Sequence, residues 1–156
     1  MLRFLIAILI STTILLSLTQ PATAQRSSAE KAVTSVASTY FEAWYAGDGD
    51  QMEEIVHPML AKRGPLVRES KEIELSDMSA LKLIQATESG GGSSAPDSLV
   101  SKTISVLSIN SNIASVKVDS KLLTEYLQLV KWKGEWKIIN VLWEIKPKWR
   151  AKWNYS

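Results

Sequence analysis

The stretch that decides the fold is residues 103–145, which read TISVLSINSNIASVKVDSKLLTEYLQLVKWKGEWKIINVLWEI. Segments rich in β-branched and aromatic residues, as strands are, lie at 103–109, 113–119, 124–132 and 136–145. Short polar or glycine-containing turns separate two pairs of them, at 110–112 and 133–134. Such short connections join antiparallel neighbours. The last third of the chain therefore predicts an antiparallel meander.

A long helix is expected before this meander. Ser27 and Glu30 are spaced as a capping box, in which the two side chains satisfy free amides at a helix start. One face of a helix is then predicted by the apolar residues Val33, Val36, Ala37, Tyr40, Phe41 and Trp44. The small residues at 46–49 end this helix, and Asp50 opens a short second one that stops near Pro58.

The middle of the chain is less regular. Residues 72–75 alternate between charged and apolar side chains and predict an edge strand, and Ser76 can cap a third helix. The glycines at 90–92 begin a stretch that predicts a mobile loop running to about Ser101. Helices first and a meander afterwards indicate an α+β domain.

The amino end has the three parts of a secretory signal peptide. Arg3 provides a positive start, residues 4–18 are largely apolar, and Ala22 and Ala24 are small residues after the breaker Pro21. We expect residues 1–24 to be cleaved off, a domain over 25–145, and a basic aromatic tail over 146–156. The alternative is an uncleaved anchor, although the apolar run is shorter than the ~20 residues that span a bilayer.

Composition excludes several function classes. The whole chain has 18 Lys and Arg against 16 Asp and Glu, and cleavage would remove one of the cations, Arg3, leaving a net charge of about +1. A dedicated nucleic-acid-binding protein usually has a strong basic excess. The chain has no cysteine, so disulfides, thiolate catalysis and cysteine-ligated zinc are excluded. The exported domain is therefore expected to depend on its packed core.

Several segments together resemble a known family. They are YFEAWYAGD at 40–48 followed by Met52, His57 and Pro58, IASVKV at 113–118, EYL at 125–127, and GEWKIINVLW at 134–143. The chain resembles the putative lumazine-binding family over about residues 29–145. That family has the nuclear transport factor two-like fold, shared with ketosteroid isomerase and polyketide cyclases. The resemblance implies a strongly curved sheet around the first helix, a conical pocket between them, and dimers formed through the outer sheet face.

The residues also predict a ligand-binding pocket. Tyr126 and Gln128 lie on alternate positions of one strand and share a face, and with Tyr40 and Trp44 they can line an aromatic pocket. Asn140 is the one polar residue on an otherwise apolar face of the last strand, so its amide needs a partner, either a ligand or the backbone. Such a pocket suits a small apolar or heteroaromatic molecule. The alternative is that these aromatic side chains only fill the core.

Catalytic candidates are few. His57, the only histidine, suits acid–base chemistry, or it satisfies free carbonyls at a helix end. Glu125 is a strand carboxylate, but it should face away from Tyr126, so a paired acid base and tyrosine donor is not supported. A lone histidine cannot build a metal site, and Asp48 and Asp50 are interpreted as a helix terminator and cap. No motif for a cofactor is found.

Two features suggest partners. The last strand is mostly apolar on both faces, which a strand with one face in water is not, so we expect a homodimer through the sheet or a covering tail. In that tail, Trp149 and Trp153 stand among four cations. They favour contact with a membrane surface or an anionic partner. The alternative is a tail folded across the protein's own or its partner's sheet.

The sequence is thus interpreted as an exported, non-catalytic domain that binds a small molecule. The first alternative is an enzyme of isomerase, cyclase or dehydratase type on the same scaffold. The second is a protein-interaction module that uses the sheet face and the tail.

Overall fold

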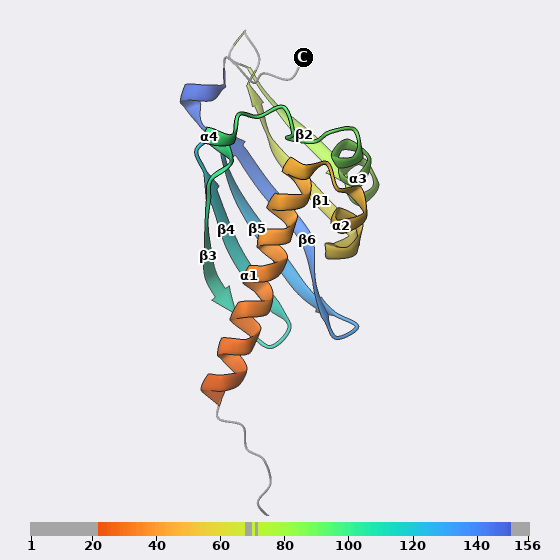
Figure 1. The fold of residues 1–156 in the computed structure, drawn as a ribbon, viewed down its shortest axis with the longest axis vertical. Helices are drawn as coiled ribbons and strands as arrows, with labels where there is room; N and C mark the ends of the chain where they lie inside the picture. The colour runs from red at the N-terminus through yellow and green to blue at the C-terminus, as the bar shows by residue number, and fades with distance from the viewer. Residues whose placement is uncertain (1–21, 68–69, 71, 151–156) are drawn as a thin grey trace, which may run out of the picture.

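The computed structural model describes residues 22–67, 70 and 72–150 (Figure 1). Most of the expected signal peptide and Trp153 therefore lie outside the described residues. Within the described ranges, no helix is long and apolar enough to cross a membrane.

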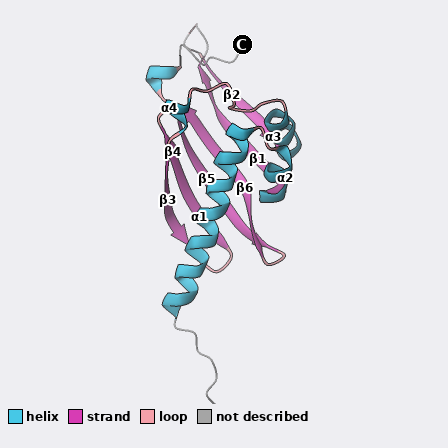
Figure 2. Cartoon of the chain, viewed as in Figure 1, coloured by secondary structure: helices cyan, strands magenta, loops and turns pink. Residues whose placement is uncertain are grey.

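A long helix packs across one face of a six-stranded sheet, as the predicted α+β class requires (Figure 2). In chain order the elements are α1 (Ala22–Ala46), α2 (Gly49–Ile55), β1 (Val56–Val67), β2 (Ile73–Ser79), α3 (Ala80–Glu88), α4 (Asp97–Val100), β3 (Lys102–Ile109), β4 (Ile113–Ser120), β5 (Leu123–Trp132), β6 (Glu135–Ile145) and a 3-10 turn, Pro147–Trp149. All four strands predicted in the last third are confirmed, each within one residue at either end.

The sheet has the order β2-β1-β6-β5-β4-β3. Its neighbours are antiparallel except β1 and β6, which run parallel. The predicted edge strand exists as β2, but it extends to Ser79 and contains Ser76. Ser79 is therefore the residue that caps α3, and its Oγ accepts the amide of Lys82 at 3.4 Å.

Two further local predictions are corrected. α1 begins at Ala22, so Ser27 lies inside a helix that continues on both sides and has no free helix start to cap. The cap of α2 is Asp48 rather than Asp50, because the Asp48 carboxylate accepts the amide of Gln51 at 2.9 Å. α2 ends at Ile55, and the chain then enters β1, a strand that the sequence pattern did not indicate.

The core lies between α1 and the inner face of the sheet. α1 contributes Val33, Ala37, Tyr40 and Phe41, which are nearly or fully buried. The three central strands contribute Val116, Val118, Leu127, Leu129, Ile138 and Val141. In β4 and β5 these buried side chains occupy alternate positions, so the sheet has a distinct inner and outer face.

A β-bulge interrupts this alternation in β6. Ile138 pairs with Leu129 and Asn140 with Gln128, so Ile139 is an extra residue on the β6 side. Trp136 and Ile138 face the core before the bulge, and Val141 does so after it. An uninterrupted alternation, which the sequence analysis assumed, would have placed Val141 on the other face, because one inserted residue exchanges the two faces.

Candidate functional site

A cavity of about 450 Å³ lies near the end of α1, on the side of the sheet formed by the edge strand β2 and its neighbours β1 and β6. Its walls are largely apolar. The residues that line it are Trp44, Tyr45, Lys62, Leu66, Ser76, Met78, Ala86, Ser89, Gly91, Gly92, Ser94, Ala95, Leu122, Leu123, Trp143 and Ile145. Lys62 is the one charged residue among them.

Lys62 belongs to a buried polar cluster with Glu125 and Tyr40. Its Nζ donates to Glu125 Oε1 at 2.7 Å and to Tyr40 Oη at 2.5 Å, and the Tyr40 hydroxyl donates to Glu125 Oε1 at 2.9 Å. The side chains of Lys62 and Glu125 are only 8% and 4% exposed. Buried charges persist when they are paired and hydrogen-bonded, and here each group partners the other two.

The cluster also fixes the protonation of its phenol. Burial raises the pKa of Tyr40 well above 10.0, and the negative charge of Glu125 and the hydrogen bond to it raise the pKa further. Tyr40 therefore stays a neutral hydroxyl that donates to the carboxylate. The cluster is an ammonium, a carboxylate and a phenol, with no net charge.

Aromatic rings surround the ammonium. Lys62 Nζ lies 5.2 Å from the ring centroid of Tyr40, 5.4 Å from that of Trp44 and 5.7 Å from that of Trp143. These distances allow cation–π attraction. Because Lys62, Trp44 and Trp143 all line the cavity, the ammonium and the two indole rings lie beside the same space.

The alternation of buried and exposed residues in β1 explains why the Lys62 side chain points toward the cavity. In β1, Leu60, Lys62 and Gly64 are buried, whereas Arg63 is exposed. Gly64 is required because a Cβ at that position would lie 2.5 Å from the carbonyl oxygen of Trp143 and 2.6 Å from its ring. Sequence reasoning missed Lys62 and Trp143. Residues 60–66 show no clear alternation, because Leu60 and Leu66 are apolar in one alternate set and Ala61 and Pro65 in the other, so no local pattern indicated Lys62.

The loop at residues 90–92, the glycine loop, positions the indole of Trp44. The Gly92 amide donates to the Trp44 carbonyl at 3.0 Å. A Cβ on Gly91 would lie 2.3 Å from that carbonyl oxygen, and one on Gly92 would lie 2.7 Å from the Trp44 Nε1. The glycines of the predicted loop therefore pack directly on Trp44 and form part of the cavity wall. The loop does not run to Ser101 as expected, because Asp97–Val100 form α4.

The structure separates the predicted pocket residues. Trp44 lines the cavity, and Tyr40 lies behind it in the buried cluster. Tyr126 and Gln128 do share one face, as expected, but it is the outer face, because Glu125, Leu127 and Leu129 fill the inner face of β5. The expectation that they line a pocket with Tyr40 and Trp44 is thus corrected.

Asn140 also lies away from the cavity. It pairs with Gln128 across the sheet, and the bulge before it moves it to the outer face. The sequence analysis grouped it with Trp136 and Ile138, which face the core. The correction follows from the extra residue at Ile139.

The two catalytic candidates have different surroundings. His57 is buried in β1 outside the cavity lining, where its Nδ1 accepts the amide of Met59 at 3.1 Å and its ring meets Trp132 edge-on, with the centroids 4.7 Å apart. Glu125 faces inward, opposite to Tyr126 as expected, and is held beside the cavity by Lys62 and Tyr40. The described residues contain no group of three or more His, Asp or Glu side chains that can hold a metal ion.

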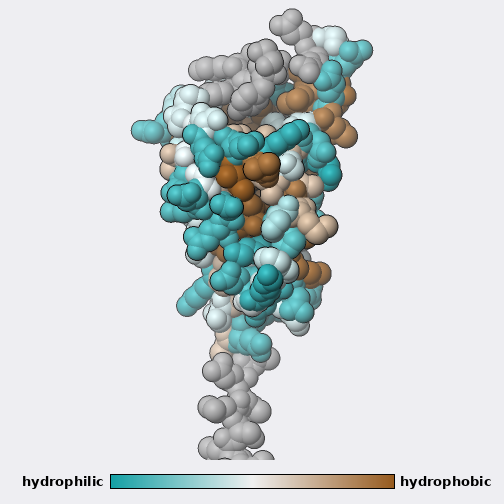
Figure 3. Space-filling model, turned by 90° about the vertical axis from the view of Figure 1, so that its right-hand side faces the viewer, coloured by the Kyte–Doolittle hydropathy of each residue, from teal (hydrophilic) through white to brown (hydrophobic). Residues whose placement is uncertain are grey.

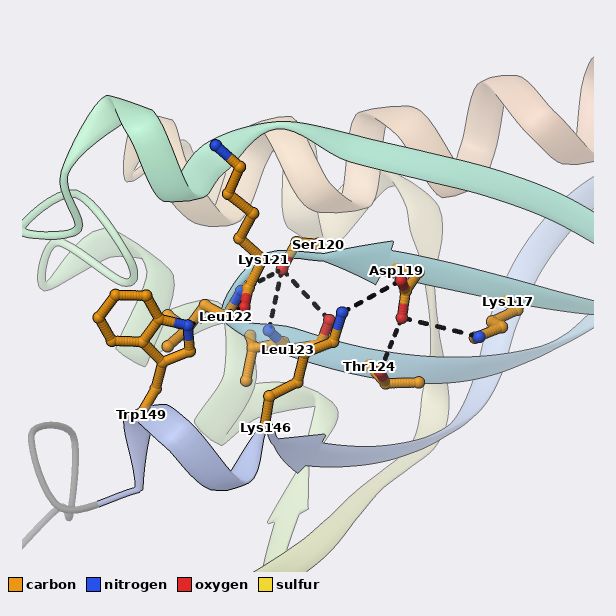
Figure 4. Close-up of polar contacts among 9 residues, drawn as sticks. All are labelled: Lys117, Asp119, Ser120, Lys121, Leu122, Leu123, Thr124, Lys146 and Trp149. Atoms are coloured by element: carbon orange, nitrogen blue, oxygen red, sulfur yellow. Dashed lines mark hydrogen bonds and ion pairs between the residues drawn. The ribbon is translucent and has the colours of Figure 1, made fainter.

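The start of the tail packs on the turn between β4 and β5, which forms another part of the cavity wall (Figure 4). Trp149 Nε1 donates to the Lys121 carbonyl at 2.9 Å, and its ring packs with Leu99, Leu122 and Ile145. Ser120 Oγ accepts the amides of Leu122 and Leu123 at 3.2 and 2.9 Å. The described part of the tail therefore folds on its own domain. Membrane contact through Trp149 and Trp153 stays a prediction.

Asp119 secures the same turn from the outer face. It accepts the Thr124 hydroxyl at 2.7 Å and the Lys146 ammonium at 3.1 Å (Figure 4). The hydrogen bond from Thr124, assisted by the two lysines nearby, lowers the pKa of Asp119. The turn is thus held by the polar contacts of Asp119 on one side and by Trp149 on the other.

The hydrophobic surface outside the cavity is divided. On the side of the molecule that carries α2 and α3, hydrophobic residues lie in separate patches among hydrophilic ones (Figure 3). On the outer sheet face, Tyr126 is 45% exposed and Leu142, its partner across β5 and β6, is 52% exposed.

Comparison with known proteins agrees with this architecture. A nuclear transport factor two-like protein of unknown function from Silicibacter pomeroyi is 20% identical, with a TM-score of 0.59 over 78% of this chain and 98% of that one. One from Shewanella baltica, also of unknown function, is 16% identical, with a TM-score of 0.59 over 78% and 96%. At these identities the likeness shows the fold alone.

No curated protein matches the chain. The model of one protein family, described as putative lumazine-binding, matches residues 28–144. This match confirms the resemblance inferred from residues 29–145. The chain belongs to the putative lumazine-binding family and has the nuclear transport factor two-like fold.

Proposed function

We propose that this protein, once exported, binds a small, flat apolar or heteroaromatic molecule in the cavity between Trp44 and Trp143, without transforming it. The observation that carries the proposal is the cavity itself, about 450 Å³ with indole walls and one buried charged residue, Lys62. Ligand sites are typically concave, mostly apolar spaces of roughly 300–1,000 Å³ with a few polar groups.

The family description supplies a first probe. Lumazine is a bicyclic heteroaromatic molecule, small enough for a cavity of about 450 Å³. Its flat ring suits contact with indole faces, which prefer offset stacking or edge-to-face packing. Lumazine therefore represents the chemical class, and the natural ligand is to be identified separately.

Native mass spectrometry of the mature protein from its own host compartment should reveal a co-purified ligand and its stoichiometry. In parallel, titration with lumazine should quench tryptophan fluorescence. Ala95→Phe, which fills space on the cavity lining, should weaken binding strongly, whereas Ser93→Phe, on an exposed residue outside the lining, should not. No co-purified ligand, together with no difference between these variants, would refute the proposal.

A second candidate function is supported by Glu125, a carboxylate held next to the cavity by an ammonium at 2.7 Å. An isomerase, cyclase or dehydratase requires such a titratable group beside its substrate. Glu125→Gln should then abolish turnover, whereas His57→Ala, outside the lining, should not. Activity that survives Glu125→Gln would exclude this candidate.

We also propose that the mature protein forms a homodimer through the outer sheet face. Its support is the exposed apolar pair Tyr126 and Leu142 on neighbouring strands. The third candidate, a protein-interaction module, is less favoured because the protein's own side chains leave the cavity open.

A further inference from the structure

We propose that Lys62 anchors the ligand by donating a hydrogen bond to a neutral carbonyl oxygen, with the flat ring that carries the carbonyl packed against Trp44 and Trp143. The inference rests on the proposed binding function and specifies its ligand class: aryl ketones and heteroaromatic carbonyl compounds rather than carboxylates or plain hydrocarbons.

The first step is the number of donors on Lys62. An ammonium carries three N–H donors. Two of them are used within the protein, toward Glu125 Oε1 at 2.7 Å and Tyr40 Oη at 2.5 Å. Lys62 also lines the cavity. The remaining donor is therefore available to an acceptor in that space, and a buried donor left without an acceptor is costly.

The second step is the charge of that acceptor. Glu125 already neutralises Lys62, and the side chains of the pair are only 8% and 4% exposed. Among the described residues that line the cavity, no other side chain is charged. A carboxylate ligand would place a second negative charge beside one ammonium in a poorly solvated site, where repulsion from Glu125 is weakly screened. A neutral carbonyl oxygen accepts the hydrogen bond without that repulsion.

The third step is the shape of the rest of the ligand. Lys62 Nζ lies 5.4 and 5.7 Å from the ring centroids of Trp44 and Trp143, so a group that reaches the ammonium also reaches both indoles. The other lining residues are mostly aliphatic or small, such as Leu66, Met78 and Leu123. A flat aromatic body with the carbonyl at one edge matches this arrangement.

Three matched probes test the anchor: 2-acetylnaphthalene, 2-ethylnaphthalene and 2-naphthoate, with lumazine as a reference. Calorimetric titration of the intact mature protein should give 2-acetylnaphthalene roughly tenfold tighter binding than 2-ethylnaphthalene, because a hydrogen bond to a charged donor is gained. It should also bind tighter than 2-naphthoate.

Variants then assign the difference to Lys62. Lys62→Met/Glu125→Gln leaves no unpaired buried charge and should bind the ketone and the hydrocarbon equally. Glu125→Gln alone removes the competing carboxylate and should make 2-naphthoate the preferred probe. The matched control is Lys102→Met/Glu42→Gln, a lysine–glutamate pair at 2.8 Å whose Nζ lies 4.9 Å from the Phe41 ring, outside the cavity lining. It should keep the wild-type order.

The outcomes separate the two levels of the proposal. Equal affinities of the three probes for the wild type, or a ketone preference that persists in Lys62→Met/Glu125→Gln, would overturn the anchor and leave the binding function standing. Failure of every probe, lumazine included, would overturn the anchor, and together with the absence of a co-purified ligand it would overturn the binding function as well. Circular dichroism of each variant confirms that the comparison is made on folded protein.

Discussion

At the scale of single residues, the pair of Lys62 and Glu125 is the most consequential feature of the molecule. The two charges lie 2.7 Å apart beside a cavity whose walls are largely apolar. An ion pair in such a place adds little net stability, because desolvation offsets attraction, but removal of one partner leaves a charge unpaired. Because the pair adds little net stability but is costly to break, we infer that its role is to position the Lys62 ammonium rather than to stabilise the fold.

Lys62→Met is expected to lower the free energy of unfolding by about 3–5 kcal/mol, because the Glu125 carboxylate is left buried and unpaired. Lys62→Met/Glu125→Gln should recover most of that loss. Urea unfolding of the single and double variants measures both values. If the two substitutions instead destabilise the protein additively, the pair is not coupled as the geometry indicates.

Tyr40 gives a second prediction at this scale. Its pKa is raised well above 10.0 by burial and by Glu125, so the folded state holds the phenolic proton more tightly than the unfolded chain does. The contribution of Tyr40 to stability is therefore fully present below about pH 10 and is lost as the pH rises toward the folded pKa. In absorbance titration at 295 nm, one tyrosine should ionise late, and Tyr40→Phe should remove that late component. A late component that survives in Tyr40→Phe belongs to another tyrosine.

At the scale of elements, the cavity walls are held by connections rather than by the sheet alone. The glycine loop after α3 packs on Trp44, and the β4–β5 turn is fixed by Ser120, Asp119 and Trp149. Loops placed on a rigid scaffold commonly carry binding residues. Here the scaffold is α1 and the sheet, and the connections complete the enclosure.

Gly92→Ala tests the glycine loop. A Cβ there would lie 2.7 Å from Trp44 Nε1 and 2.8 Å from the Tyr45 ring, so the Trp44 indole must shift. We expect lumazine binding to weaken by tenfold or more, with a loss of stability of roughly 1–3 kcal/mol from overpacking. Fluorescence titration and urea unfolding measure the two effects. Ser93→Ala, one position further and exposed, is the control, and equal affinities of both variants would argue against the role of the loop.

At the scale of the whole molecule, the outer sheet face is the surface that we propose for self-association. The β-bulge at Ile139 keeps Val141, Trp143 and Ile145 on the inner side of β6, whereas Tyr126 and Leu142 are exposed on the outer side beside Gln128 and Asn140. This face is therefore mixed rather than wholly apolar, as non-obligate interfaces are.

Light scattering at micromolar concentration should show a dimer of the mature protein. Leu142→Lys should convert it to a monomer, because the substitution buries a charge in the interface. Leu81→Lys changes a leucine on α3 that is also exposed but lies off the sheet face, and it should leave the dimer intact. A monomeric wild-type protein would end this proposal.

Sequence alone determined the α+β class and the four strands after residue 102, because period-two patterns and short turns are local signals. The resemblance of several segments to one family indicated the family, which the match over residues 28–144 confirms. The sequence also placed Glu125 opposite Tyr126. Only the tertiary structure decided which of the two faces inward, since a strand pattern is symmetric until a helix covers one side. The bulge at Ile139 reversed the faces of β6, and β1 brought Lys62 from a stretch with no clear period. The cavity was thus decided by pairing between distant segments, which no local pattern records.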